Sequence, residues 1–444
     1  MAENLSISRY TYLFVSSKKK NLVYNSRTNT FLEVSDDLYK ELLKCKDDKR
    51  NIRKIDIDVL SSLLKRKIIV EAMEDDDFLL EHQYETDRRS YSKYVLGLTL
   101  VPTLGCNFSC YYCFEEHKRM VTMNEETEDA VIAFINSHHE SRQLALNWYG
   151  GEPLMAINTI ERLLDKISQK TTLEMTKHSL ITNGYFINNR VLALFKRYPL
   201  TKMQVTLDGS RERHNSIRKT KTDLYTYDKI IENTSRFIEE FPNTLVDIRV
   251  NIERNNKNDY YQVAEELQEK WKQKNVRVYP GFLRIDNEQK TEYASETLNH
   301  KEIEELLWDA RQRNLLEIPL YPQSFCSKSC AANRQCAYIV GPEGEVYKCW
   351  NDVSDPKKIV GNIFTNKMTN KTLLNRYIVG TKWYNDPVCK KCFFLPICSG
   401  ACAWYTLRNK YENGKYDLCT CTQKAPGMLD KYLEIIMILF YDQW

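Results

Sequence analysis

Strand-like and helix-like patterns alternate from Tyr94 to about residue 320, and no other feature of the sequence constrains the fold as strongly. Apolar runs such as YVLGLTLV, KHSLITNG and KMQVTLDG alternate with amphipathic stretches such as NRVLALFKRY and DYYQVAEELQEKW. Two of the helices are expected near residues 124–137 and 158–170. Six such units over about 220 residues predict a parallel sheet, either an open doubly wound sheet or a partial barrel.

Special motifs come directly after the first four predicted strands. Cys106, Cys110 and Cys113 follow the first strand, and GGEP, TNG and LDG follow the next three. In parallel α/β folds, the loops after the strands lie at one edge of the sheet, where ligands bind. We therefore expect these motifs to contribute to one site.

The three cysteines are spaced C-x3-C-x2-C, and no fourth cysteine lies close by. Three thiolates can hold three irons of a [4Fe-4S] cube and leave one iron open to another ligand. The alternative is a zinc loop, but structural zinc usually takes four protein ligands, and the nearest histidine is His117. The motif therefore favours an iron-sulfur cluster with one reactive iron.

Ten of the fourteen cysteines lie between residues 326 and 421, in a segment of loops with Gly and Pro. Such a segment cannot bury enough apolar surface on its own, so it is expected to need metal to fold. A terminal helix is expected from about Met428. Disulfides are rare in reducing compartments, so the clustering indicates metal-ligand sets. Cys45, in contrast, lies in an apolar helix pattern and is expected in a core.

The first 88 residues predict a small α+β module. The runs YTYLFV, NLVYN and TFLEV, separated by polar turns, suggest an antiparallel meander. Ser35 is expected to cap a helix over DDLYKELLKC, and a second helix and a short strand at KIIVEA follow. The acidic run Glu71 to Asp77 is interpreted as a linker. This order of elements predicts a winged-helix-like module.

Composition excludes several other classes of protein. The 64 basic residues nearly balance the 60 acidic ones, which argues against a nucleic-acid surface. No apolar segment approaches the roughly 20 residues that a membrane helix needs, and EIIMILF near the end reads as a buried helix end. The start, MAENLSISRY, has no secretory apolar region. We therefore expect a cytoplasmic protein with no nucleic-acid or membrane partner.

The cysteine loop, Tyr112 before its last cysteine, and GGEP together resemble the radical S-adenosylmethionine (SAM) enzymes, over roughly residues 94 to 320. The resemblance implies a partial (β/α)6 TIM-type barrel in which SAM chelates the open iron through its amino and carboxylate groups. Reductive cleavage of SAM would then yield a radical that abstracts hydrogen from an unactivated carbon. Family members suggest the following contacts with SAM: Gly150, Gly151, Glu152 and Pro153 around the ammonium group, Arg218 at the carboxylate, Thr182 and Asn183 near the ribose, and Tyr112 at the adenine.

The later cysteines resemble the SPASM extension of peptide-modifying radical SAM enzymes, particularly the run C-x2-C-x5-C-x3-C. The resemblance implies two further [4Fe-4S] clusters, three in all. Two structural zinc sites are the alternative. Cys326 is left over, as a free thiol or a replacement ligand. The implied ligands are Cys330, Cys336, Cys349 and Cys402 for auxiliary cluster I, and Cys389, Cys392, Cys398 and either Cys421, which is favoured, or Cys419 for auxiliary cluster II.

The order of the three parts resembles maturases of ribosomally made peptides. It implies a leader-recognition domain at residues 1–88, a radical SAM barrel at 89–319 and a SPASM domain at 320–444. The leader of a precursor peptide would add a strand to the front module, and the enzyme would install a thioether, C–C or C–O cross-link or a related modification. A one-electron donor such as flavodoxin or ferredoxin would reduce the cluster.

Two other functions remain open on the sequence. A sulfatase maturase that makes formylglycine shares both cluster domains, but such enzymes carry an aspartate directly after the cysteine that matches Cys349. Trp350 stands there instead, and Asp352, two residues further on, is a weaker choice for a catalytic base. A non-catalytic, zinc-stabilised scaffold that binds peptides is the alternative of another class. It predicts zinc in place of iron and no cleavage of SAM.

Overall fold

The computed structural model describes residues 4–113, 119–220, 222–284, 296–316, 330–398, 400–419, 429–431 and 433–434. The chain divides into two compact units. The first contains Met1–Tyr91, Ile318–Arg334 and Ile378–Trp444, and the second contains Ser92–Glu317 and Gln335–Tyr377. Each unit is described by itself, and the division into a leader-recognition, a barrel and a SPASM domain stays a prediction.

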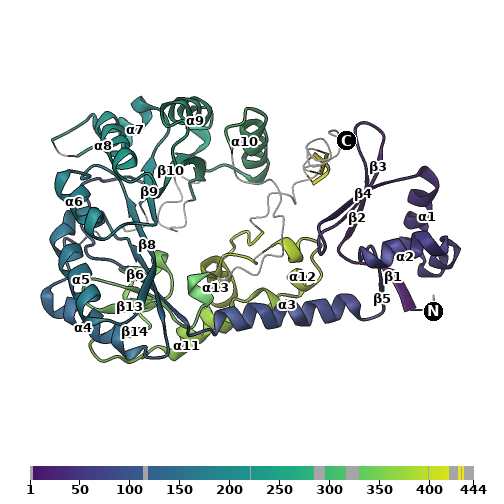
Figure 1. Ribbon diagram of the computed structural model, residues 1–444, viewed down its shortest axis with the longest axis horizontal. Helices are drawn as coiled ribbons and strands as arrows, with labels where there is room; N and C mark the ends of the chain where they lie inside the picture. The colour runs from purple at the N-terminus through teal and green to yellow at the C-terminus, as the bar shows by residue number, and fades with distance from the viewer. Residues whose placement is uncertain are drawn as a thin grey trace. The chain divides into compact units, whose positions relative to one another are not determined.

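Six parallel strands form the centre of the second unit, in the order β11-β10-β9-β8-β7-β6 (Figure 1). The predicted βα alternation over this region is confirmed. Every second residue of β6, β7 and β9 is buried, which is the pattern of strands with one face on a core. The strands are β6 (Val95–Leu100), β7 (Gln143–Trp148), β8 (Glu174–Thr182), β9 (Lys202–Leu207), β10 (Leu245–Ile252) and β11 (Val276–Phe282).

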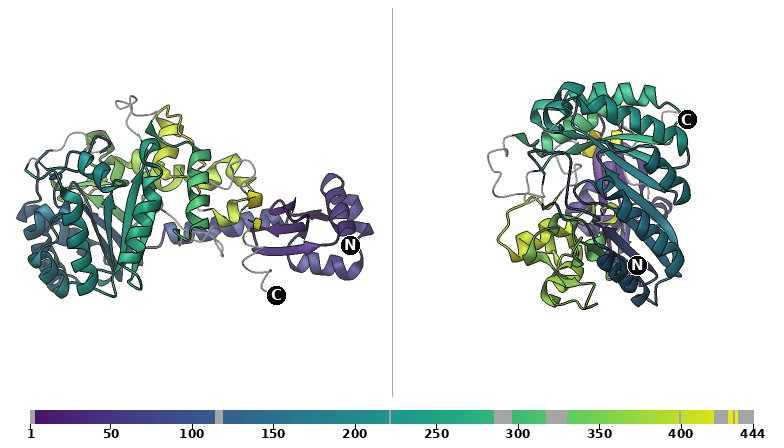
Figure 2. Two further views of the ribbon diagram at one scale, coloured as in Figure 1. Left: turned by 90° about the horizontal axis from the view of Figure 1, so that it is seen from above. Right: turned by 90° about the vertical axis from the view of Figure 1, so that its left-hand side faces the viewer.

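Helices follow these strands and line the outside of the curved sheet (Figure 2). The expected helices near residues 124–137 and 158–170 are confirmed, and the Asn124 side chain caps the first by accepting a hydrogen bond from Thr127 N. Their apolar residues recur at helical spacing, so each helix buries one face. The helices are α4 (Glu125–Ser137), α5 (Ile157–Lys170), α6 (Asn189–Arg197), α7 (Arg211–Ile217), α8 (Thr226–Glu240), α9 (Asp259–Lys270) and α10 (His300–Gln312).

Three short strands from the cysteine-rich region extend the same sheet beyond β6, giving nine strands in one sheet. β12 (Ala337–Val340) pairs in parallel with β6, and β13 (Glu345–Tyr347) and β14 (Gly361–Asn362) continue antiparallel. Gly97 lies opposite Ala337, and a Cβ at Gly97 would lie 3.3 Å from the Ala337 Cβ. The sequence did not indicate this extension. A short helix, α11 (Lys371–Asn375), follows it.

The front of the first unit has the strands and helices that the sequence predicts. Ser35 caps the first helix, since its side chain accepts a hydrogen bond from Leu38 N. Cys45 is buried in the core between these elements, as expected. The meander is β2 (Thr11–Val15), β3 (Asn21–Asn25) and β4 (Thr30–Val34); β1 (Leu5–Ile7) pairs with β5 (Ile69–Glu71), and the helices are α1 (Asp36–Asp47) and α2 (Ile57–Lys65), with a 3-10 turn at Lys49–Lys54 between them.

The interpretation of the acidic run as a linker is wrong. β5 ends at Glu71, and the helix α3 (Glu74–Ser90) begins only three residues later. Acidic side chains are favourable in the first turn of a helix because they face the positive end of its dipole. Asp75 is also buried, and it accepts hydrogen bonds from Ser8 Oγ at 3.0 Å and Arg9 N at 2.8 Å. The run therefore starts a helix and ties it to the front module.

The cysteine-rich part of the first unit consists of short helical turns packed on the front sheet. Phe394 and Ile397 share a core with Phe14, Leu22 and Tyr24. Helical residues at 429–431 and 433–434 agree with a terminal helix, while the run IIMILF lies outside the described residues. Across the described ranges, no helix combines the length and the apolar character needed to cross a bilayer. The elements are α12 (Pro387–Lys390), a 3-10 turn at Leu395–Ile397 and α13 (Ala403–Tyr411).

Candidate functional site at the carboxyl edge of the sheet

The cysteine loop begins after β6, at the carboxyl edge of the parallel strands. Its last part is a tight turn, in which Cys113 N donates to Cys110 O at 3.1 Å. Phe108 N donates to Cys106 Sγ at 3.4 Å, and the Phe108 ring is buried. A backbone N–H aimed at sulfur stabilises the thiolate form. One backbone N–H of the loop is therefore aimed at a cysteine sulfur, and the role of the three cysteines as cluster ligands stays a prediction.

The GGEP motif packs directly against the residues that precede Cys106. Gly151 N donates to Thr103 O at 3.2 Å, and Glu152 N donates to Gly105 O at 2.8 Å. Gly150 has φ +136°, and a Cβ there would lie 2.5 Å from Thr103 O. A Cβ at Gly151 would collide with the carbonyl of Gly105. The two glycines are thus required because two backbone loops approach each other closely.

Glu152 joins three of the predicted site residues. It is buried, and its carboxylate accepts from Thr182 Oγ1 at 2.7 Å and from Asn183 N at 2.7 Å. It also caps the short helical turn that Pro153 starts, by accepting from Leu154 N at 3.0 Å. Burial raises the pKa of Glu152 to about 7, even though these hydrogen bonds act in the opposite direction. Close to neutral pH, this carboxyl group can therefore change its charge.

Asn107 connects this group to the cysteine loop, and the sequence did not single it out. Asn183 Nδ2 donates to Asn107 Oδ1 at 2.8 Å. Asn107 Nδ2 is buried and makes no hydrogen bond within the described part of the chain. The signal in the sequence was only its position directly after Cys106. The structure therefore brings the first, second and third post-strand motifs into one site.

Arg218 and Tyr112 meet on the other side of the cysteine loop. Tyr112 OH donates to Asp208 at 2.6 Å, and Arg218 Nη2 donates to Tyr112 OH at 2.8 Å. Arg218 Nε also pairs with Asp208 at 2.7 Å. Asn251, on β10, donates to Asp208 Oδ1 at 2.8 Å. Asp208 belongs to the LDG motif that the sequence flagged, whereas nothing in the sequence pointed to Asn251.

A second polar group lies beside Tyr111. The Tyr111 hydroxyl donates to Glu253, and Glu253 also forms an ion pair with Arg213. Glu253 is buried and comes directly after β10, at the same edge as the cysteine loop. This carboxylate is not among the site residues that the sequence predicts. Its only signal was its place immediately after a predicted strand.

The residues after Cys349 have structural partners. Asp352 is buried, and its carboxylate accepts from Tyr377 OH at 2.6 Å. The Trp350 ring stacks on the Tyr149 ring, next to Gly150, with centroids 5.7 Å apart. Asp352 therefore has a structural role in this geometry, and its choice as a catalytic base stays a prediction.

The predicted ligands of auxiliary cluster I are divided between the two units. Cys336 and Cys349 flank the hairpin of β12 and β13 in the second unit. Cys330 and Cys402 belong to the first unit. In the residues that the structure describes, no three His, Cys, Asp or Glu side chains converge as a ready-made metal site. This ligand set therefore stays a prediction.

The predicted ligands of auxiliary cluster II all belong to the first unit. Burial raises the pKa of the Cys389 thiol to about 12, and so do the nearby groups of Asp386, Cys398, Cys392 and Cys419. Cys392, Cys398 and Cys419 thus each lie within electrostatic range of Cys389, and this ligand set stays a prediction. Cys421, which the sequence analysis favoured, and the leftover Cys326 both lie outside the described residues.

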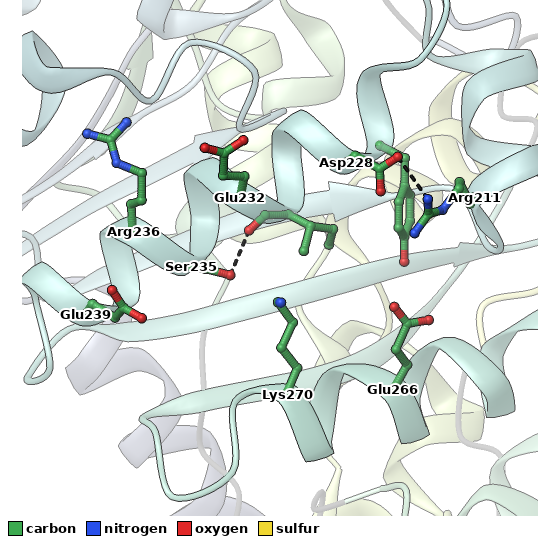
Figure 3. A pocket seen from close by; sticks show the side chains of 10 residues that line it. Arg211, Asp228, Glu232, Ser235, Arg236, Glu239, Glu266 and Lys270 are labelled. Atoms are coloured by element: carbon green, nitrogen blue, oxygen red, sulfur yellow. Dashed lines mark hydrogen bonds and ion pairs between the residues drawn. The ribbon is translucent and has the colours of Figure 1, made fainter.

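A charged cavity of about 380 Å³ lies on the helical layer, between α8 and α9 (Figure 3). Arg211 pairs there with Asp228 at 3.0 Å, and Lys270 and Glu266 project from α9 toward α8. The lining has both signs of charge and none of the predicted site residues. The carboxyl edge of the sheet therefore remains the candidate site.

Part of the chain is similar to known proteins. Residues 100–267 match the sequence profile of the Radical SAM superfamily. The chain is 22% identical over 295 residues to the radical SAM cyclopropyl synthase TigE of Paramaledivibacter caminithermalis, covering 56% of this chain and 61% of TigE. Matches to uncharacterised proteins of Synechocystis and Methanocaldococcus jannaschii cover 33% and 38% of those proteins. The chain thus spans less than two thirds of these curated relatives.

Two solved structures share the fold at low identity. The structure of anSMEcpe with bound AdoMet and the Cp18Cys peptide has a TM-score of 0.61 and 21% identity, and covers 79% of this chain and 99% of that chain. Streptococcus suis SuiB bound to its precursor peptide SuiA has a TM-score of 0.51 and 14% identity, and covers 94% of this chain and 100% of that chain.

Proposed function

Because residues 100–267 match the profile of the radical SAM superfamily, we propose that this chain is a radical SAM enzyme that modifies a ribosomally synthesised precursor peptide. The observation that carries the proposal is the three-cysteine loop held against GGEP and TNG at the carboxyl edge of the sheet. The modification is a cross-link (thioether, C–C or C–O) or a related change. The structures of SuiB with its precursor peptide and of anSMEcpe with a bound peptide support a peptide substrate.

The residues at this edge fit a [4Fe-4S] cluster and SAM. Cys106, Cys110 and Cys113 would supply three thiolates. The buried Nδ2 of Asn107 is a hydrogen-bond donor that lacks an acceptor among the described residues, which suits an anionic group beside the loop. When bound and reduced, the cluster and SAM supply a one-electron cleavage and the abstraction of a hydrogen atom from an unactivated carbon.

The chain's own residues bind and orient SAM. The Glu152 carboxylate would accept hydrogen bonds from the SAM ammonium group while it holds Thr182 and Asn183 in place. Arg218 would pair with the SAM carboxylate. Thr182 and Asn183 would lie near the ribose, and Tyr112 would contact the adenine. The buried strand ends around these residues would help to exclude water from the reacting carbon.

The later cysteines would hold two more [4Fe-4S] clusters. Cys330, Cys336, Cys349 and Cys402 form the first set. In the second set we now place Cys419 beside Cys389, Cys392 and Cys398, because Cys419 lies within electrostatic range of Cys389. Thiols that serve as ligands must stay reduced, which suits a cytoplasmic enzyme that receives electrons from a flavodoxin or ferredoxin.

The front module would recognise the leader of the precursor peptide. Among the described residues, β4 pairs with β3 on one side only, so it is an edge strand of the meander. An extended leader can add to such an edge through main-chain hydrogen bonds. Leader binding would then raise the effective concentration of the core peptide at the radical site.

The first test is anaerobic purification followed by iron, sulfide and zinc analysis and a SAM cleavage assay. Three cubes correspond to about twelve irons per chain, with 5'-deoxyadenosine formed after reduction. Replacing Cys106, Cys110 and Cys113 together by Ala should abolish 5'-deoxyadenosine formation and leave the other irons. A colourless protein with two zinc ions would instead support the peptide-binding scaffold.

The second test concerns the substrate. Co-expression with short peptides encoded beside the gene, followed by mass spectrometry, should show a mass loss of hydrogen atoms in one of them. Conversion of a Cys or Ser to formylglycine would contradict the cross-linking proposal and support a sulfatase maturase.

A further inference from the structure

Four polar side chains from four different segments form one buried cluster behind the cysteine loop. Tyr112 comes from the loop, Asp208 from the end of β9, Arg218 from the end of α7 and Asn251 from β10. Asp208 is 1% exposed, Asn251 is 4% exposed and Arg218 is 8% exposed. Burying charged groups this deeply is costly unless they are paired, so the arrangement has to be specific.

Asp208 is the centre of this cluster. Its carboxylate accepts from Tyr112 OH at 2.6 and 2.7 Å, from Arg218 Nε at 2.7 Å and from Asn251 Nδ2 at 2.8 Å. Burial alone would raise the pKa of Asp208, but Arg218 and the other neighbours hold that pKa below its usual value. The hydrogen bonds of Asp208 thus fix both the guanidinium of Arg218 and the phenol of Tyr112.

The hydrogen bonds leave one nitrogen of Arg218 for a ligand. Nε is used by Asp208 and Nη2 by Tyr112. The third nitrogen of Arg218, Nη1, makes no hydrogen bond within the described ranges. It is also not one of the fully buried polar atoms that lack a partner. A guanidinium that is held at two nitrogens has lost most of its rotational freedom, so it can bind an anion with little further loss of entropy.

We propose that Asp208 is a positioning residue for SAM, which acts by orienting Arg218 toward the SAM carboxylate and by fixing Tyr112 next to Cys113. The inference rests on the proposed function and adds a residue to its site. It explains why an acidic residue, which would repel a carboxylate if it stood alone, lies next to the expected carboxylate site. Asp208 neutralises one part of the guanidinium, and its hydrogen bonds with Arg218 and Tyr112 leave Nη1 as the remaining donor.

The chain provides a matched control. Asp247, on β10, is also a buried carboxylate, 3% exposed, and it pairs with Arg277 at 2.8 Å and Lys202 at 2.6 Å. It lies near the start of β10, away from the carboxyl end where Asn251 and Glu253 lie. Asp247→Asn therefore removes a comparable buried charge without touching the site.

The experiment measures SAM affinity by anaerobic equilibrium dialysis on the reconstituted holoenzyme. Asp208→Asn should raise the SAM dissociation constant by about tenfold, as expected for the loss of an oriented, charge-assisted contact, whereas Asp247→Asn should leave it unchanged. In an Arg218→Gln background, Asp208→Asn should have little additional effect, because the two residues act through one contact. The EPR signal of the reduced cluster should shift less on addition of SAM in Asp208→Asn than in the wild type.

Three results would overturn the inference. These are an unchanged SAM affinity in Asp208→Asn, a full additional loss in the Arg218→Gln background, or an equal loss in Asp247→Asn. If Asp208→Asn does not retain iron, Tyr112→Phe serves as the second variant, because it removes one hydrogen bond to Asp208 and keeps the ring. Tyr112→Phe should weaken SAM binding several-fold. An unchanged SAM affinity in Tyr112→Phe counts against the inference. Failure of the wild type to bind SAM would instead reject the proposed function itself.

Discussion

At the scale of single residues, two opposing effects act on the ionisation of the Glu152 carboxyl group. It accepts three hydrogen bonds, two of which join it to the end of β8, and these favour the carboxylate form. Its burial favours the neutral form, and the net result is a pKa of about 7 against an ordinary value of 4.5. Because the folded-state pKa is raised, ionisation of Glu152 costs stability as the pH rises from about 4.5 through about 7.

This pKa predicts how SAM binding depends on pH. A cationic ammonium group binds the carboxylate, so the SAM dissociation constant should fall as the pH rises from about 6 to about 8 and then level off. Glu152→Gln should bind SAM more weakly, by about 1.5 to 3 kcal/mol above neutral pH, and without this pH dependence. Equilibrium dialysis across this pH range checks both expectations. An equal pH dependence in wild type and Glu152→Gln would assign the titration to another group.

The GGEP loop lies close to the residues before Cys106, so a methyl group added at Gly151 and one added at Gly105 should change the retained iron unequally. Gly151→Ala should lower the iron retained by the cysteine loop, because its Cβ would collide with the backbone carbonyl of Gly105. Gly105→Ala is the control, since its Cβ would meet mainly the flexible end of Met120 at 3.2 Å. Iron analysis after reconstitution checks the pair. Equal iron content in the two variants would show that the backbone contact is not needed.

The sequence predicted those site residues whose motifs come directly after strands. Glu152 and Asn183 were found this way, and the parallel sheet brings them together. Asn251 and Glu253 were missed because their role depends on which residues of β10 face the cysteine loop. That orientation is set by the register between β9 and β10, which the local pattern of residues does not reveal.

At the scale of elements, the front module and the Cys389 loop are packed as one body. The His82 ring stacks on Trp383 with centroids 4.7 Å apart, and Trp383 Nε1 donates to Thr86 Oγ1 at 3.1 Å. Ser26 Oγ donates to Phe393 O at 2.6 Å. The loop that carries three of the predicted ligands of auxiliary cluster II is thus held by α3 and the meander.

Because the front module and the Cys389 loop pack together, we expect a substitution at their contact to disturb both. Trp383→Ala should cost about 3 to 5 kcal/mol, because it empties a buried site and breaks a buried hydrogen bond. Hydrogen exchange should then rise in β2 to β4, and the iron content should fall toward eight per chain. Trp350→Ala is the control, since Trp350 is 46% exposed and lies in the other unit. Unchanged exchange in the meander after Trp383→Ala would contradict the coupling.

The elements of the βα region were predictable because each has a regular apolar period. The linker interpretation of Glu71 to Asp77 failed because a run of carboxylates is equally typical of solvated loops and of the first turn of a helix. The extension by β12 was missed for a different reason. A four-residue strand carries little pattern, and its partner β6 lies far away in the sequence.

At the scale of the whole molecule, the barrel is incomplete without the cysteine-rich region. Gly97 N donates to Cys336 O at 2.9 Å, and Val101 N donates to Val340 O at 2.9 Å. A chain cut to residues 89–319, the boundary that the sequence suggested, would expose the backbone of β6 as an apolar edge. Exposed edges of this kind pair with other chains.

We therefore expect the chain of residues 89–319 to aggregate and the chain of residues 89–377, which keeps β12 to β14, to remain more monodisperse. Size-exclusion chromatography of the two, prepared under the same anaerobic conditions, checks this. Monomeric behaviour of the shorter chain would show that β12 is dispensable for the barrel.

The pairing of β12 with β6 also bears on how such enzymes can diversify. A recombination event that exchanged the cysteine-rich region at the end of the βα alternation would bring in a foreign strand beside β6. A side chain at position 97 would crowd Ala337, since its Cβ would lie 3.3 Å from the Ala337 Cβ, so the residue at 97 and the strand paired with it have to match. We therefore expect the two regions to be inherited as a matched pair.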